Sequence, residues 1–282
     1  GCDKHCTYCI IPSLRGKFRS VPEERLLAQA EYMASQGVKE LILVAQETTV
    51  YGTDLYGKKT LHILLKKLCQ IKGIRWIRVL YCYPEEIYDE LIQVMKEEKK
   101  ICNYLDLPIQ HASDRILKRM GRRTTRKQLE DIIAKLRREI PDIVLRTSLI
   151  TGFPGETQED HEELMEFVDE MEFDRLGVFT YSPEEGTPAE TMEGQVPEEV
   201  KEERRDELMS LQQEISLEKG DERIGQELLV MIEGKVSGES AYIARTYADA
   251  PKVDGYIFVQ TGELLVTGDF ARVRVTGALE YD

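Results

Sequence analysis

Three cysteines stand within the first nine residues of the chain, in the stretch GCDKHCTYC. The spacing of Cys2, Cys6 and Cys9 lets three thiolates converge on one metal cluster while the backbone between them wraps around it. In a four-iron four-sulfur cluster, three thiolates leave one iron open, and that iron can chelate a small cofactor and pass an electron to it. The triad therefore predicts a catalytic iron–sulfur centre with these cysteines as its metal ligands.

A structural zinc site is the simpler alternative for the same loop. His5 or another side chain would then be the fourth ligand. Zinc sites of this kind usually combine two C-x-x-C pairs, and no second pair follows nearby. The spacing therefore favours iron. The other cysteines, in apolar segments, are expected to be buried small hydrophobic residues: Cys69, Cys82 and Cys102.

Length and composition indicate a folded protein of 282 residues, 41% hydrophobic and 32% charged, with room for one large core and a smaller domain. The formal net charge of −14 repels polyanions and attracts basic partners, so free nucleic acid is a less favoured substrate. We find no apolar run long enough for a membrane span and no signal peptide, which predicts a cytoplasmic protein without a membrane partner. Chemistry at the second residue, without an initiator methionine, indicates an excised fragment.

Amphipathic helices alternate with short aliphatic runs between residues 20 and 180, the pattern of repeated β-α units around a parallel sheet. The sequence predicts an α/β fold, a partial TIM-like (β/α) barrel, whose chemistry gathers at the carboxyl ends of the strands. Five parallel strands are expected, over residues 39–45, 75–81, 103–109, 143–150 and 175–181.

The composition shifts to Pro, Gly and Glu over residues 182–197, which predicts a domain boundary. We expect a first domain over 1–196, a linker helix over 197–220 with a solvated charged face at 198–207, and a second domain over 221–282. In that second domain, alternating strands separated by glycine-rich turns predict a small antiparallel β-barrel, with strands at 228–232, 242–246, 256–260 and 271–275.

The cysteine loop resembles the CxxxCxxC signature of radical S-adenosylmethionine (SAM) enzymes, and the IIPSLRGKFRS that follows is similar to their methylthiotransferase branch. The same branch is matched by AQETTVYG from Ala45, LPIQHASDRILKRMGRR from Leu107 and RTSLITGFPGET from Arg146, while the terminal barrel resembles an OB-like TRAM domain. The resemblance implies that a 4Fe-4S cluster reductively cleaves S-adenosyl-L-methionine and that the resulting radical activates a C–H bond for methylthiolation. An enclosed barrel mouth would protect that radical.

The resemblance also implies cofactor contacts for residues near the strand ends. Tyr8 would lie near the adenine, and Gln46 and Glu47 would receive the methionine ammonium. Arg146 and Arg123 could each meet the cofactor carboxylate or a substrate acid. The ordinary alternatives are packing for the tyrosine, solvation for the carboxylate and surface ion pairs for the arginines.

Two further loops follow predicted strands. Gly152 and Gly155 permit close backbone approach to the adenosine moiety of the cofactor, with a plain tight turn as the alternative. Gln110, His111 and Ser113 match the segment that faces the substrate in the family, although a lone histidine is more often a packing or hydrogen-bonding residue.

Within the branch, the chain is most similar to the enzymes that methylthiolate an aspartate of a small-subunit ribosomal protein, a likeness shared by the segment ADAPKVDG from Ala248. Residues 221–282 contain eleven acidic and six basic residues, a net charge of −5. An RNA-reading module needs a basic face, so an acidic TRAM domain favours a basic ribosomal protein as partner. A tRNA adenosine methylthiotransferase is the alternative.

Other partners follow from the resemblance alone. It implies a reductant such as flavodoxin or ferredoxin, and a second 4Fe-4S cluster in an N-terminal domain that this sequence lacks. The fragment is thus expected to bind and cleave SAM without completing methylthiolation. A non-catalytic iron–sulfur or zinc module that docks on the ribosome is the alternative from a different class of function.

Overall fold

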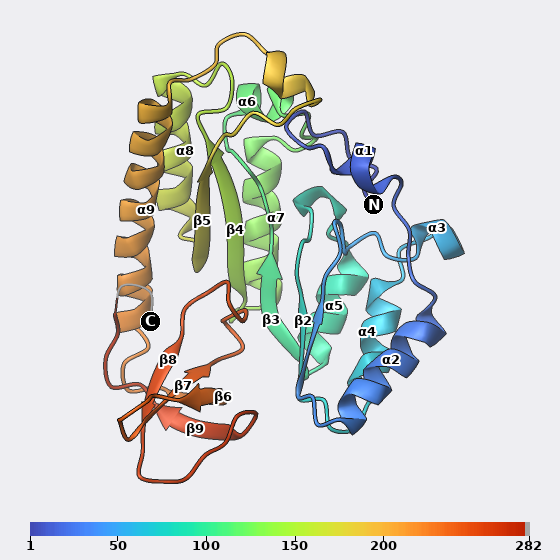
Figure 1. Cartoon of the computed structure of the whole chain (residues 1–282), viewed down its shortest axis with the longest axis vertical. Coiled ribbons are helices and arrows are strands. Elements are labelled where there is room, and N and C mark those ends of the chain that lie inside the picture. The colour runs from blue at the N-terminus through green and yellow to red at the C-terminus, as the bar shows by residue number, and fades with distance from the viewer. Residues whose placement is uncertain (280–282) are drawn as a thin grey trace.

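The computed structural model describes residues 1–279, which form a parallel sheet with its helices and a smaller antiparallel unit (Figure 1). The strands of the parallel sheet are β1 (Glu40–Leu43), β2 (Trp76–Val79), β3 (Ile101–Asp106), β4 (Val144–Thr151) and β5 (Arg175–Thr180). They pair in the order β1-β2-β3-β4-β5, so the sheet follows the chain without reversal. All five predicted strands and their parallel arrangement are confirmed.

Helices connect the strands and cover the sheet, as expected of β-α units. The longer ones are α2 (Glu23–Ser35), α4 (Leu61–Cys69), α5 (Asp89–Glu97), α7 (Arg126–Glu139), α8 (Gln158–Met171) and α9 (Glu198–Asp221). The short ones are α1 (Ile11–Arg15), α3 (Thr53–Tyr56), α6 (Asp114–Arg119) and the 3-10 turns η1 (Pro84–Glu86) and η2 (Pro188–Thr191). Within residues 1–279, no helix combines the length and apolarity needed to cross a bilayer.

The charged helix α9 packs against β4, β5 and α8 and places Leu208 in the main core. The predicted solvated face is wrong for Lys201 and Arg204, which are only 5% and 6% exposed. The Lys201 ammonium donates to the Tyr181 carbonyl at 2.8 Å, and the Arg204 guanidinium pairs with Glu156 at 2.8 Å. These partners make burial of the two charges tolerable.

The second unit is a curled antiparallel sheet of β6 (Glu227–Lys235), β7 (Ala241–Arg245), β8 (Ile257–Gln260) and β9 (Phe270–Arg274), in the order β8-β7-β6-β9. It has its own small core around Val230, Ile232 and Tyr242. The four predicted strands are confirmed. The last three residues of the predicted domain, 280–282, lie outside the described residues.

The second unit packs under the amino-terminal end of the parallel sheet (Figure 1). Glu40 of β1 accepts hydrogen bonds from Arg78 of β2 at 2.9 Å and from Arg245 of β7 at 2.6 Å. We call these three residues the basal ion cluster; none of their side chains is more than 5% exposed. Beside it, the Tyr104 hydroxyl donates to Asp254 at 2.7 Å. The opposite, carboxyl end of the sheet is left for the predicted site.

Candidate functional site

The cysteine loop lies across the carboxyl end of the sheet, near α6 (Figure 1). The Thr7 backbone holds it at both sides, because its N–H donates to Met120 and its carbonyl accepts from Ala189, each at 2.9 Å. Gly121 has a φ of +72°, and a Cβ there would lie 2.6 Å from the His5 carbonyl oxygen. This glycine lets the loop pass close to the end of α6.

The three predicted thiol ligands lie on this loop as free cysteines. Cys2 and Cys6 are buried and Cys9 is half-buried. Burial raises the pKa of Cys2 and Cys9, and the charges of the neighbouring loop thiols add to that rise. Within residues 1–279, no three metal-ligating side chains already converge tightly enough to hold a metal ion. Three thiols on one short loop nevertheless suit an iron–sulfur cluster, whose binding would deprotonate them and draw them together.

Two residues that sequence reasoning missed lie beneath the loop. The Tyr83 hydroxyl is 3.8 Å from the Cys6 sulfur, and the Arg122 guanidinium lies 4.3 Å from the centre of the Tyr83 ring. Lys4 lies 5.0 Å from the same ring centre and pairs with Glu86 at 2.5 Å. No sequence signal separated Arg122 from the other basic residues of KRMGRR.

Glu47 follows β1 and is only 2% exposed, whereas Gln46 beside it is exposed. One carboxylate oxygen of Glu47, Oε1, accepts from the Thr49 N–H at 2.9 Å and from the Thr49 hydroxyl. The other oxygen, Oε2, has no hydrogen-bond partner in the described part of the chain. Burial raises the pKa of Glu47 to about 7. A buried carboxylate with one free oxygen suits a cationic ligand group.

The raised pKa predicts a pH-dependent cost of burying Glu47. Because its pKa rises from 4.5 to about 7, its contribution to stability is full below pH 4.5 and is lost as the pH rises to 7. Relative to Glu47→Gln, the parent chain without cofactor should lose about 3 kcal/mol of unfolding free energy between pH 4 and pH 8. Urea unfolding of both proteins across this range measures the difference. A difference that does not vary with pH would contradict the assignment.

A cavity of about 340 Å³ opens at the carboxyl ends of the strands, lined among others by Tyr8, Tyr81, Gln110 and Arg146. Tyr81 and Gln110, which follow β2 and β3, have positive φ angles of 58° and 75°. Such backbone strain in residues other than glycine tends to gather at functional sites. Tyr8 packs edge-on against Phe153, 6.3 Å between ring centres. The cavity thus joins the cysteine loop to two strained strand ends.

Arg146 is the cationic residue lining this cavity, and its charge is balanced. Its guanidinium donates to Asp106 at 2.8 Å and lies 3.4 Å from Asp254 of the second unit. Asp106 in turn accepts from the Tyr81 N–H at 3.2 Å. A chain of contacts therefore runs from the second unit to the strained cavity wall. Arg123 is exposed and does not line the cavity.

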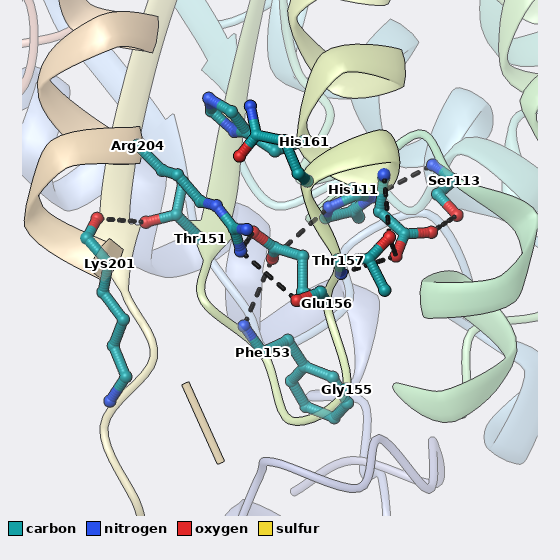
Figure 2. A network of polar contacts seen from close by, with 12 residues as sticks. His111, Ser113, Thr151, Phe153, Gly155, Glu156, Thr157, His161, Lys201 and Arg204 are labelled. Carbon is teal, nitrogen blue, oxygen red and sulfur yellow. Dashed lines mark hydrogen bonds and ion pairs between the residues drawn. The ribbon is translucent and has the colours of Figure 1, made fainter. Parts of the chain in front are cut away.

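Figure 2 shows the buried network around Glu156, which joins the loops after β3 and β4 to α8 and α9. His111 lies 3.5 Å from the Glu156 carboxylate and accepts from the Ser113 N–H, and the Ser113 hydroxyl donates to Asp160 at 2.7 Å. Both side chains turn into this network, so the hydrogen-bonding alternative is confirmed for His111 and also describes Ser113. Of the three residues, only Gln110 lines the cavity.

Gly152 and Gly155 adopt positive φ angles of 69° and 84°. A Cβ at Gly152 would lie 2.1 Å from Lys201 Cγ, and one at Gly155 would lie 2.9 Å from Arg119 Nε. Close contacts inside the chain, with α9 and α6, thus favour glycine at both positions, and their role toward a cofactor stays a prediction.

Comparisons with known proteins agree with this architecture. The family model described as Radical SAM superfamily matches residues 1–168, and the TRAM domain model matches residues 224–282. The chain is 64% identical over 282 residues to "Ribosomal protein uS12 methylthiotransferase RimO" of Lachnoclostridium phytofermentans, and 53% identical to the protein of that name from Clostridium botulinum (strain Langeland). All of this chain is covered, but only 64% and 63% of those relatives, so the chain spans less than two thirds of their length.

Among solved structures, the chain is similar to the radical SAM methyltransferase TsrM from Kitasatospora setae, with cobalamin and a [4Fe-4S] cluster bound. The TM-score is 0.56 at 16% identity, over 67% of this chain and 37% of that one. At this identity the likeness supports the fold alone.

Proposed function

The chain belongs to the radical SAM superfamily, and from that premise we propose that it is the catalytic core of a methylthiotransferase that modifies an aspartate of ribosomal protein uS12. The observation that carries the proposal is the 64% identity to a uS12 methylthiotransferase along the entire chain. The matched TRAM domain supports it. Because ribosomes work in the cytoplasm, the proposed substrate implies a cytoplasmic enzyme.

In this proposal Cys2, Cys6 and Cys9 hold a 4Fe-4S cluster. When bound, the cluster and SAM supply a one-electron reduction of the sulfonium and a carbon radical that abstracts hydrogen. The chain itself contributes a loop fixed by its backbone and, beside it, a cavity at the carboxyl ends of the strands. A bound cofactor that closed this cavity would help to protect a radical reaction from side products.

We assign the SAM contacts to residues around that loop and cavity. Glu47 would accept hydrogen bonds from the methionine ammonium through its unpartnered oxygen, with Gln46 beside it. Tyr8 would line the adenosine end, together with the backbone at Gly152 and Gly155. Arg146 would meet a carboxylate of the cofactor or the substrate in competition with Asp106 and Asp254, which already pair with it.

The substrate assignment favours protein over RNA. The net charge of −5 over residues 221–282 suits a basic ribosomal protein and opposes a phosphate backbone. We propose that the radical SAM unit comprises residues 1–196, that residues 197–220 connect it, and that the acidic TRAM unit of 221–282 contacts uS12. The electron would come from flavodoxin or ferredoxin. The second cluster would belong to a part of the full-length enzyme outside this chain.

Anaerobic reconstitution with iron and sulfide tests the proposal. We expect about four irons per chain and an electron paramagnetic resonance spectrum of the reduced protein that shifts when SAM is added. 5'-Deoxyadenosine should form under a chemical reductant. Zinc in place of iron, or a cluster indifferent to SAM, would instead support a ribosome-docking module. Tight, steeply salt-dependent binding of an anticodon stem-loop by the second unit within the full chain would favour the tRNA alternative.

A further inference from the structure

Arg122 is a buried cation without an anionic partner. Arg122 is only 7% exposed, and within residues 1–279 its guanidinium forms no ion pair with a carboxylate. One guanidinium nitrogen donates to the Pro108 carbonyl at 2.9 Å. The other two nitrogens, Nε and Nη1, have no hydrogen-bond partner in the part of the chain that the structure describes.

Such an arrangement is unfavourable unless an anion compensates it, because a buried charge needs both pairing and hydrogen bonds. The Tyr83 ring, 4.3 Å from the guanidinium carbon, offsets part of the cost through a cation–π contact. The ring does not provide a hydrogen-bond acceptor for Nε or Nη1. The Glu85 carboxylate attracts Arg122 from a distance but, within the described residues, does not form an ion pair with it.

The surroundings of the guanidinium indicate which anion could compensate its charge. The Tyr83 hydroxyl contacts the Cys6 sulfur at 3.8 Å, so a single ring separates Arg122 from the cysteine loop. The positive charge of Arg122 acts on Cys6 and Tyr8. Lys4, on the same ring, already pairs with Glu86 at 2.5 Å. Arg122 therefore supplies the uncompensated positive charge below the loop.

A 4Fe-4S cluster with three thiolate ligands is anionic, and one-electron reduction adds a further negative charge. No bond or proton changes in that step, so its free energy depends on fixed charges and hydrogen bonds near the cluster. We propose that Arg122 is a positioning residue that, together with Tyr83, stabilises the reduced cluster held by Cys2, Cys6 and Cys9. This inference rests on the proposed function.

The test compares Arg122→Gln with Arg123→Gln in the reconstituted full chain. Both variants remove one positive charge, but Arg123 is exposed. Redox titration followed by electron paramagnetic resonance should show the reduced-to-oxidised ratio of Arg122→Gln about tenfold lower than the parent at the same applied potential, a shift of 59 mV to more negative values for one electron. Arg123→Gln should titrate like the parent.

Arg122→Lys separates the electrostatic role from a merely structural one. It keeps the charge but loses the planar fork, so its potential should lie between those of the parent and Arg122→Gln. If Arg122→Gln fails to load iron, the lysine variant provides the test instead. A cluster reduction potential below that of the parent then supports the inference. A parent-like potential in a cluster-loaded Arg122→Gln, or in the lysine variant where the glutamine variant fails to load, would overturn it. Failure of the parent chain to take up iron would instead contradict the proposed function itself.

Discussion

Replacing Cys6 with alanine is expected to abolish iron–sulfur loading and, with it, the formation of 5'-deoxyadenosine. Cys6 is the middle residue of the triad, buried beside Tyr83. Two remaining thiolates would leave two irons without protein ligands, and such a cluster would not be retained. Iron and sulfide content after anaerobic reconstitution measures the loss.

The matched control is Cys102→Ala, which removes an equally buried free thiol from the small cluster of Cys102, Trp76 and Tyr104. We expect this variant to load iron fully and to lose about 1 kcal/mol of unfolding free energy from the small cavity created. Full iron loading by Cys6→Ala would refute its assignment as a ligand. Equal loss in both variants would indicate damage to folding rather than to ligation.

Glu40→Ala is expected to produce the largest loss of stability among single changes in the basal ion cluster. Its carboxylate is the shared partner of Arg78 and Arg245, whose side chains are 0% and 2% exposed. Removing it leaves Arg78 without an anionic partner among residues 1–279 and leaves Arg245 with Glu233 alone, which costs about 3 to 5 kcal/mol. Urea unfolding measures the effect.

Glu227→Ala provides the comparison, because Glu227 pairs with Arg274 at 3.3 Å while its side chain is 57% exposed. An exposed pair of this kind contributes about 0 to 1 kcal/mol. If Glu40→Ala cost no more than Glu227→Ala, the basal ion cluster would not stabilise the contact between the two units.

The parts of the fold that could be predicted depend on short-range pattern. Each strand of the parallel sheet carries several aliphatic residues within a short segment, and amphipathic helices separate these segments. The cysteine loop could be predicted equally well, since its three cysteines lie within eight residues of one another. The burial of Glu47 was harder to predict, although its position shortly after a strand indicated a functional role.

The remaining features depend on contacts between distant segments. No sequence pattern distinguishes Arg122 from its neighbour Arg123. Only the path of the chain after α6 buries the first side chain and exposes the second. Lys201 lies in a charged helix, and its burial depends on the Tyr181 carbonyl, which accepts a hydrogen bond from its ammonium group. His111 turned inward for a similar reason, the carboxylate of Glu156. No local pattern encodes these partners.

The basal ion cluster also limits how the two units of this chain can be exchanged for those of other proteins. Glu40 and Arg146 lie on the parallel sheet, yet Arg245 and Asp254, which contact them with opposite charge, belong to the second unit. A foreign TRAM domain would have to supply equivalent charges, or Glu40 and Arg146 would each lose one oppositely charged partner and keep only Arg78 and Asp106. The two units therefore form a charge-matched pair, and chimeras joined at α9 should require changes on both sides of this contact.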